Sequence, residues 1–154
     1  MAKTKELTEK DDVKKKKQTI KIIIDGFEKL GWKYDYDKDA DSFKTGFTCT
    51  NVSVITGIHV GDVSVCYMCE MDFTVKKRDY PMILREINQI NNDLFCGRFF
   101  LDPDSGRIYF SYSILNFVCE IHPAFGAAFI KLMADLIDEY GGRLKEVLAS
   151  VAAD

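Results

Sequence analysis

The stretch from Cys66 to Cys69 reads Cys-Tyr-Met-Cys, a spacing with which many proteins bind a metal ion or exchange thiols and disulfides. Residues 62–75 alternate between apolar and polar types, which predicts an extended strand. In a strand, residues three apart lie about 10 Å apart and point to opposite faces. A disulfide requires α-carbons within about 7 Å, and a metal requires both sulfurs on one centre. We therefore expect neither metal binding nor redox chemistry at this pair.

Four aspartates at alternate positions between Asp35 and Asp41 resemble the start of a calcium-binding loop. An EF-hand loop also requires glycine at its sixth position and glutamate at its twelfth. Counted from either of the first two aspartates, neither position holds the required residue, and no helix is predicted to follow. The aspartates therefore predict a polar turn between strands.

His59 and His122 are the two histidines. His59 lies in a predicted turn, and His122 precedes the predicted start of a helix; neither has a cysteine or acid at metal-ligand spacing. A histidine could still act as general base for Cys96 or Cys119 if the fold brings them together. The chain carries no glycine-rich phosphate loop and no Gly-x-Ser-x-Gly motif. We expect no catalytic residue, cofactor or metal, while an unrecognised enzyme remains open.

The composition is that of one globular domain in a reducing compartment. The chain has 154 residues, of which 47% are hydrophobic and 29% charged. No apolar run approaches the roughly 18 to 20 residues of a membrane span, and the N-terminal segment lacks the apolar core of a secretory signal. Five cysteines are an odd number and are most simply buried thiols. We expect a cytoplasmic protein.

Charge divides the chain into two parts. Residues 1–21 carry a net charge of +4, and the remainder carries −7. An acidic body argues against nucleic-acid binding, which requires clustered lysine and arginine. The run from Lys14 to Lys17 is either a solvated segment or a docking site for an acidic partner. We predict a flexible lysine-rich tail over residues 1–16 and a single domain over 17–154.

Apolar periodicity and turn residues predict an α+β fold. The expected elements are a helix over 17–30, strands over 32–36, 43–54 and 62–75, a helix ending at Gly97, a hairpin over 97–115, and a helix over 123–140 followed by a short terminal helix after Gly141 and Gly142. A further turn is expected over 57–61. The order is α-β-β-β-α-β-β-α, a five-stranded antiparallel sheet with the helices packed mainly on one face.

The aromatic content is high, with eleven phenylalanines, seven tyrosines and one tryptophan. Helices that cover one face of the sheet leave the other face open. Tyr109 and Leu115, or the pair Phe99 and Phe100, are candidates for that open face. Such residues either form a binding surface for a partner or are scattered surface aromatics without a role.

The chain resembles the YbjN family, which is similar in fold to the type III secretion chaperones. The resemblance lies in the order of elements and in two stretches, LGWKYDY after the first helix and INQINNDLFCGRFFLDPDSGRIYFSYSIL after the third strand. It includes Asn88 and Asn91 at a helix end, Gly97-Arg98-Phe99, the turn from Asp104 to Gly106 and the long last helix. It covers about residues 17–150.

The resemblance implies a small dimeric binding module and no enzyme. In chaperones of this fold the middle helix and the last hairpin help to build the dimer, and other apolar surface holds an extended client segment. Carried onto this chain, the dimer or partner candidates are Ile83, Ile87, Ile90, Phe110 and Tyr112, to which the open-face reasoning adds Phe99 and Tyr109. The isoleucines serve equally well as core.

We therefore hypothesise a non-enzymatic cytoplasmic binding module, chaperone-like or regulatory, that forms a homodimer and holds a segment of a protein partner. It is expected to bind neither nucleic acid nor membrane. The alternatives are a small-molecule-binding protein or unrecognised enzyme with a pocket between sheet and helices, and a regulator whose Lys14–Lys17 run docks an acidic surface.

Overall fold

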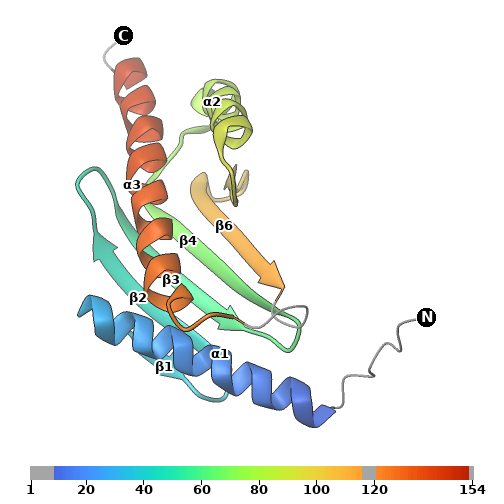
Figure 1. The fold of residues 1–154 in the computed structure, drawn as a ribbon. Coiled ribbons are helices and arrows are strands. Elements are labelled where there is room, and N and C mark those ends of the chain that lie inside the picture. Colours follow the sequence, from blue (N-terminus) through green and yellow to red (C-terminus); the bar gives the residue numbers. More distant parts are fainter. Residues whose placement is uncertain (1–8, 116–120, 153–154) are drawn as a thin grey trace.

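A computed structural model describes residues 9–115 and 121–152 and shows an antiparallel sheet with helices on one side (Figure 1). The helices are α1 (Glu9–Leu30), α2 (Tyr80–Asp93) and α3 (Phe125–Ala152), with a 3-10 turn, η1 (Lys77–Asp79), before α2. The strands are β1 (Asp35–Asp37), β2 (Ser42–Thr48), β3 (Ser53–Val60), β4 (Ser64–Thr74), β5 (Arg98–Leu101) and β6 (Arg107–Leu115). Their order across the sheet is β1-β2-β3-β4-β6-β5.

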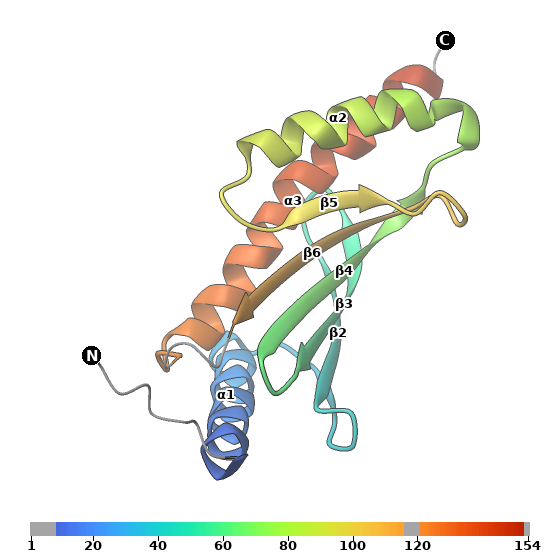
Figure 2. The same cartoon turned by 90° about the vertical axis from the view of Figure 1, so that its right-hand side faces the viewer.

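The helices form one layer and the sheet the other. Helices α1 and α3 cross each other over one face of the sheet, and α2 packs on β5 and α3 (Figure 2). None of the described helices covers the opposite face, which we call the open sheet face. None of the helices in the described part of the chain is long and apolar enough to span a membrane.

The core lies between the two layers and is rich in aromatic rings. Strand β4 shows the predicted period of two, with Val65, Tyr67, Cys69 and Met71 buried toward the helices and Met68 exposed. The ring of Tyr67 packs edge-on against that of Phe129 of α3, with ring centres 5.6 Å apart. The expectation that residues 62–75 form a strand is confirmed, and this strand lies at the centre of the sheet.

The sheet has six strands, not the five expected. The predicted strand over 43–54 is divided by a turn, in which the Cys49 N–H donates to the Val52 carbonyl at 2.9 Å. The segment 57–61, expected to turn, instead continues β3 almost to its end. There Ile58 and Val60 are both buried, so the apolar alternation of the strand outweighs the glycine beside them. The observed order is therefore α-β-β-β-β-α-β-β-α.

Helix α3 is continuous through Gly141 and Gly142, where a break was expected. These glycines are required by close packing against the β2–β3 turn. A Cβ added at Gly142 would lie 2.7 Å from the Cβ of Asn51, and one at Gly141 would lie 3.3 Å from a methyl group of Val52. Because glycine has no side chain, the helix backbone can approach the turn closely. The packing gained there offsets the low helix propensity of glycine.

Helix α1 begins at Glu9, well before the expected start at residue 17, so the run from Lys14 to Lys17 is helical. The Lys16 ammonium lies 2.7 Å from Asp41 and 3.1 Å from Asp62, which belong to two different strand connections. The hydrogen bond from Lys16 lowers the pKa of Asp41. Lys16 therefore fastens α1 to the sheet, and a docking role for an acidic partner would concern the exposed Lys14 and Lys17.

The outer edge of β5 is closed by a side chain. The Asn91 amide at the end of α2 accepts a hydrogen bond from the Phe99 N–H at 2.8 Å and donates one to the Phe99 carbonyl at 3.0 Å. An asparagine side chain carries one acceptor and one donor in the spacing that a neighbouring strand would offer. Asn91 thus satisfies two backbone groups of a strand edge and ties α2 to the sheet.

Replacing Asn91 by alanine should destabilise the protein by about 2 kcal/mol, because two backbone groups of buried Phe99 lose their partners. Asn91→Asp should cost at least as much, since a carboxylate cannot donate to the Phe99 carbonyl. Urea unfolding monitored by circular dichroism measures both changes. Neighbouring Asn92 is exposed, so Asn92→Ala should leave stability unchanged within about 0.5 kcal/mol. Equal stability of the Asn91 and Asn92 variants would contradict this role.

Candidate functional site

The two cysteines of the Cys-x-x-Cys stretch point to opposite faces of the sheet, as the strand prediction requires. Cys69 is buried in the core, whereas Cys66 is partly exposed on the open sheet face. The Cys66 sulfur accepts a hydrogen bond from the Ser113 hydroxyl at 3.4 Å. Among the described residues, no group of three or more histidines, cysteines or acids is placed to share a metal ion.

Cys66 should react with iodoacetamide at pH 8 far faster than Cys69. Burial raises the pKa of the Cys69 thiol to about 12, so this thiol stays protonated and inaccessible in the folded protein. Its folded pKa exceeds the unfolded value of about 8.5, so the stability it contributes is present below about pH 8.5 and is lost as the pH rises toward 12. Mass spectrometry of the labelled peptide distinguishes the two; equal labelling of the folded protein would contradict the assigned faces.

The histidines occupy structural positions. The His122 ring nitrogen Nδ1 accepts a hydrogen bond from the Ala124 N–H at 3.1 Å, at the turn that leads into α3. His59 lies in β3, not in a turn, and is the cross-strand neighbour of Cys66 on the open sheet face. Sequence spacing did not reveal this neighbour, because it follows from the register of two strands. Cys119 lies outside the described residues, and burial raises the pKa of the Cys96 thiol.

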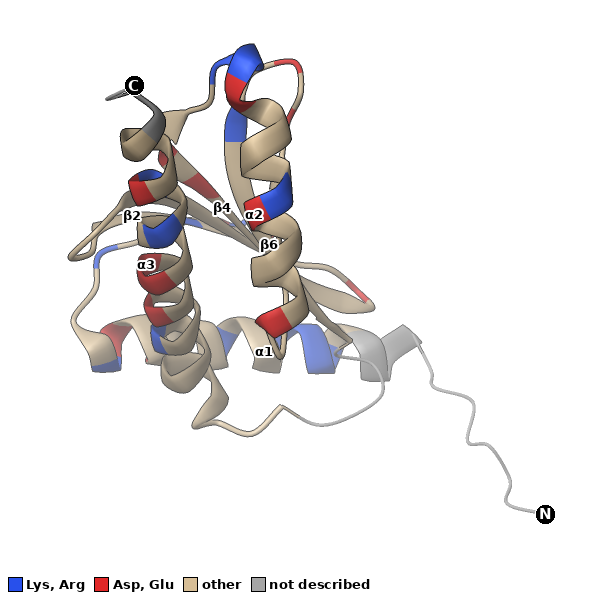
Figure 3. Ribbon diagram, turned by 90° about the horizontal axis from the view of Figure 1, so that it is seen from above, with Lys and Arg blue, Asp and Glu red and all other residues tan. Residues whose placement is uncertain are grey.

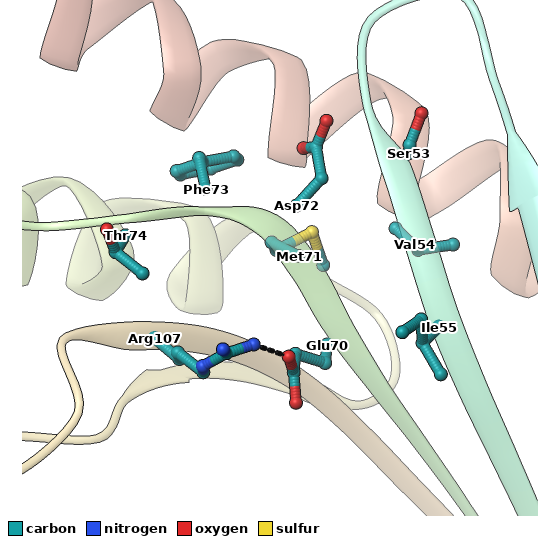
Figure 4. A pocket seen from close by; sticks show the side chains of 9 residues that line it. All are labelled: Ser53, Val54, Ile55, Glu70, Met71, Asp72, Phe73, Thr74 and Arg107. Carbon is teal, nitrogen blue, oxygen red and sulfur yellow. Dashed lines mark hydrogen bonds and ion pairs between the residues drawn. The ribbon is translucent and has the colours of Figure 1, made fainter.

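A hollow of about 260 Å³, lined by both charged and apolar residues, lies at β3, β4 and Arg107 of β6 (Figure 4). Arg107 forms an ion pair with Glu70, and the Tyr109 hydroxyl donates to the same carboxylate at 3.2 Å. Asp72, also at the hollow, lies 3.5 Å from the Lys145 ammonium of α3. Each charged group that lines this hollow is therefore paired with another, which leaves no free acid or base for chemistry there.

A second hollow, of about 360 Å³, is almost wholly apolar. We call it the Phe95 groove, and its lining residues are Phe95, Cys96, Tyr112, Phe125, Ala128, Phe129, Leu132 and Met133. Phe95 is 72% exposed and Leu132 is 40% exposed, which is unusual for side chains of this size. Stacked rings form its floor, with the centres of Phe125 and Phe129 only 4.8 Å apart.

Local backbone geometry turns Phe95 outward. Helix α2 ends at Asp93, and the Leu94 N–H makes the last helical hydrogen bond, to the Ile90 carbonyl. Two residues after Phe95, Gly97 adopts a φ of +71°, which glycine reaches without strain. A Cβ at Gly97 would overlap the ring of Phe110. Glycine is therefore required at position 97, where the chain changes direction between α2 and β5. Phe95 lies in this connection and is exposed.

The seven residues predicted for a partner or dimer interface divide into two groups. Five are buried inside the chain itself and contribute to its core: Ile83, Ile87, Ile90, Phe99 and Phe110. Phe99 was expected on the open sheet face but points the opposite way, because it alternates with Phe100. Tyr109 and Tyr112 are partly exposed, and an interface role for them stays a prediction.

The open sheet face carries apolar residues, as expected for Tyr109 and Leu115. The ring of Tyr109 stacks on that of Phe100, with centres 5.4 Å apart, and the Arg98 guanidinium lies 6.0 Å from the Phe100 ring centre. Ile55 and Met68 are exposed on the neighbouring strands. This face is mixed, with Lys44 and His59 among its apolar groups, whereas the Phe95 groove has no charged residue in its lining.

The sequence reasoning missed Phe95, Phe125 and Leu132 as site residues. Leu132 lies three residues after Phe129 and four before Leu136, so its spacing predicts burial, yet it is 40% exposed. Phe95 lies beyond the helical stripe of α2, where sequence alone does not decide between core and surface. Helix α3 carries charges of both signs, with three acidic residues, Asp135, Asp138 and Glu139, between Lys131 and Arg143 (Figure 3).

A family model described as "Putative bacterial sensory transduction regulator", YbjN, matches residues 19–146. The crystal structure of YbjN from E. coli is 11% identical, with a TM-score of 0.67 over 82% of this chain and 91% of that chain. A structure of the HopA1–SchA chaperone–effector complex is 14% identical, with a TM-score of 0.54 over 88% of this chain and 97% of that chain. These likenesses show the fold. No curated protein sequence matches the chain.

Proposed function

Since the chain belongs to the YbjN family, we propose that it is a non-enzymatic binding module with a chaperone-like role, which holds a segment of a protein partner. The observation that carries the proposal is the Phe95 groove, an aromatic hollow with Phe95 and Leu132 exposed at its rim. The likeness in fold to a chaperone of a chaperone–effector complex supports a protein as the partner.

The groove suits a protein segment for energetic reasons. Fully burying one large apolar side chain contributes about 1.5–3 kcal/mol, and aromatic residues are frequent at the centres of binding interfaces. Methionine and aromatic side chains at one site adapt to different partners. The described lining offers no charged group, so binding there would select an apolar segment.

A comparison of captured proteins tests this function. The wild-type chain and a Leu132→Glu variant, each immobilised, are exposed to the same lysate of the source organism, and the bound proteins are quantified by mass spectrometry. We expect at least one partner to be depleted at least tenfold on the variant, because a carboxylate in the groove must be desolvated. Leu84 is 49% exposed on α2 and does not line the groove, so Leu84→Glu is the matched control. Identical captures by all three proteins would contradict the proposal.

The proposal includes a cytoplasmic homodimer. We assign the second copy to the open sheet face, because no described helix covers it and Ile55, Met68 and Leu115 are exposed there. Light scattering over a hundredfold range of concentration should show a dimer that Tyr109→Glu converts to monomer. A monomer at all concentrations would remove the dimer and leave the groove proposal intact.

A pocket between sheet and helices favours a second candidate function, the binding of a small molecule. This hollow of about 360 Å³ lies between β2 and α3, with Trp32, Phe47 and Asp135 among its lining residues. Its aromatic rings, whose centres lie 5.3 Å apart, would suit an aromatic ligand. A thermal-shift screen of nucleotides, metals and metabolites tests it, and a ligand whose effect disappears in Trp32→Ala would support it.

A further inference from the structure

Strand β2 leaves part of its outer edge without a neighbouring strand. Its outer partner β1 begins at Asp35, which pairs with Lys44, and β1 does not reach beyond that pair. Strand β2 continues to Thr48, and β3 pairs with it along the whole of that extension. Residues 45–48 therefore form a short sheet edge with a strand on one side alone among the described elements.

The backbone groups of Gly46 point toward that edge. At one end of the β2–β3 hairpin the Cys49 N–H donates to the Val52 carbonyl, at 2.9 Å. At the other end the Val60 N–H donates to the Asp41 carbonyl, also at 2.9 Å. Residues whose backbone groups face the partner strand alternate with residues whose groups face outward, and the register between β2 and β3 is unbroken. Gly46 lies an odd number of positions from both Cys49 and Asp41, so its N–H and carbonyl face away from β3.

The glycine at position 46 is explained neither by the local backbone nor by packing within the chain. It is not among the glycines with a positive φ. A Cβ added there would meet nothing closer than the Val54 carbonyl oxygen, at 3.4 Å, which is an ordinary contact. Glycine inside a strand is otherwise unfavourable, and it often marks a place where a ligand approaches the backbone closely.

Gly46 forms part of the wall of the hollow between β2 and α3, which we call the Trp32 hollow. Its volume is about 360 Å³, and Trp32, Lys33, Gly46, Phe47 and Asp135 are among its lining residues. A volume of this size is typical of sites for small organic ligands. The Trp32 ring is partly exposed and offers a flat apolar surface in the same hollow as the Gly46 backbone.

We propose that the Trp32 hollow binds a purine base, carried by a nucleoside or a nucleotide, which stacks on Trp32 and pairs its hydrogen-bonding edge with the N–H and carbonyl of Gly46. This inference rests on the second candidate function, the binding of a small molecule, and specifies the chemical class of that molecule. A purine presents an acceptor and a donor side by side, which in adenine are a ring nitrogen and the amino group.

The chain itself contains the same kind of pairing. The planar amide of Asn91 accepts from the N–H of Phe99 and donates to its carbonyl, at 2.8 Å and 3.0 Å. One planar group can therefore satisfy both outward backbone groups of one strand residue. Gly46 offers the same two groups on the opposite side of the sheet.

The short edge favours a ring over a peptide strand. Beyond the end of β1, Gly46 and Thr48 are the β2 residues that direct their backbone groups outward, and the turn to β3 follows directly. An added strand would have only these two residues to pair with, whereas the edge of a single ring requires one.

The charges around the hollow distinguish a nucleotide from a nucleoside. The Asp135 carboxylate is held by the Lys131 ammonium at 2.7 Å. Lys33 is exposed and forms no ion pair with any described residue. A phosphate on the ligand would therefore meet an unpaired cation at Lys33, which would make a nucleotide bind more tightly than its nucleoside.

Trp32 is the only tryptophan of the chain, so its fluorescence reports binding in this hollow. We expect saturable quenching by adenosine or guanosine. Binding should be at least tenfold weaker for a matched analogue that lacks the donor, because the Gly46 carbonyl then loses its partner. The analogues are purine riboside in place of adenosine and guanosine methylated at its ring N–H. Tighter binding of the monophosphate than of the nucleoside would identify a nucleotide, and equal binding a nucleoside.

A second measurement also uses the wild-type protein. Amide hydrogen exchange at Gly46 should slow at least tenfold when the protein is saturated with the nucleoside that quenches Trp32. Unchanged exchange, equal binding of the nucleoside and its analogue, or quenching by neither purine would overturn the proposal. If the thermal-shift screen finds a different ligand whose effect disappears in Trp32→Ala, the purine assignment is wrong and the hollow remains a small-molecule site. If no ligand of any kind is found, both fail.

Discussion

Replacing Gly126 by alanine should destabilise the protein by about 3 kcal/mol or more, the range of severe overpacking in a core. In an ordinary helix interior the same change stabilises by about 1 kcal/mol, so the sign itself is diagnostic. Gly126 of α3 is packed against α1, and a Cβ there would overlap the carbonyl oxygen of Ile22. A Cβ at Gly26 of α1 would lie 2.6 Å from the Gly126 carbonyl carbon. The two helix backbones are in direct contact at this glycine pair.

Urea unfolding monitored by tryptophan fluorescence measures this effect. Gly57→Ala in β3 is the matched control, because its added Cβ would meet nothing closer than a carbonyl oxygen at 3.9 Å. We expect the control to change the free energy of unfolding by less than about 0.5 kcal/mol. A Gly126→Ala variant as stable as the wild type would show that α1 and α3 do not cross as closely as the structure requires.

Replacing Phe110 by alanine should lower the free energy of unfolding by about 3–5 kcal/mol, the usual cost of removing a buried phenylalanine. Phe110 is fully buried, and its ring contacts Phe99 and Tyr67, with centres 5.0 Å and 6.4 Å away. The sequence resemblance made Phe110 an interface candidate, whereas the structure makes it core.

A substitution at the neighbouring Tyr109 distinguishes a role in the core from a role in an interface. It lies on the opposite face of β6 and is partly exposed, so Tyr109→Ala should cost less than about 1.5 kcal/mol. Thermal unfolding and light scattering of both variants distinguish stability from association. A stable Phe110→Ala variant that merely dissociates a dimer would contradict the assignment to the core.

The periodic parts of the fold could be predicted from the sequence. The alternation along β4 gave the strand and the opposite faces of Cys66 and Cys69, and the spacing of the isoleucines gave the buried stripe of α2. In each case the apolar pattern matches the geometry of a single element. The order of elements was correct except for the extra strand, because most turns carry local signals such as Asp-Pro-Asp-Ser-Gly at 102–106, whereas the turn between β2 and β3 does not.

The remaining features depend on contacts between elements far apart in the sequence. The glycine at position 57 predicts a break, yet Thr56 and Ile58 on either side of it are buried and keep the strand continuous. Gly142 predicts a helix end, yet α3 continues through it and packs there against Asn51. The Phe95 groove is built from α3, β6 and the α2–β5 connection, so no single stretch contains its pattern. Sequence alone therefore could not separate core isoleucines from interface residues.

The central claim is that the Phe95 groove holds a protein partner, and site-specific photo-cross-linking in living cells tests it most directly. A photoreactive phenylalanine analogue replaces Phe95, and in a parallel strain Leu84, which lies outside the groove. We predict a covalent adduct from position 95, with mass spectrometry locating the bond in one segment of one partner, and little adduct from position 84. No adduct at position 95, or equal adducts with the same proteins at both positions, would contradict the claim.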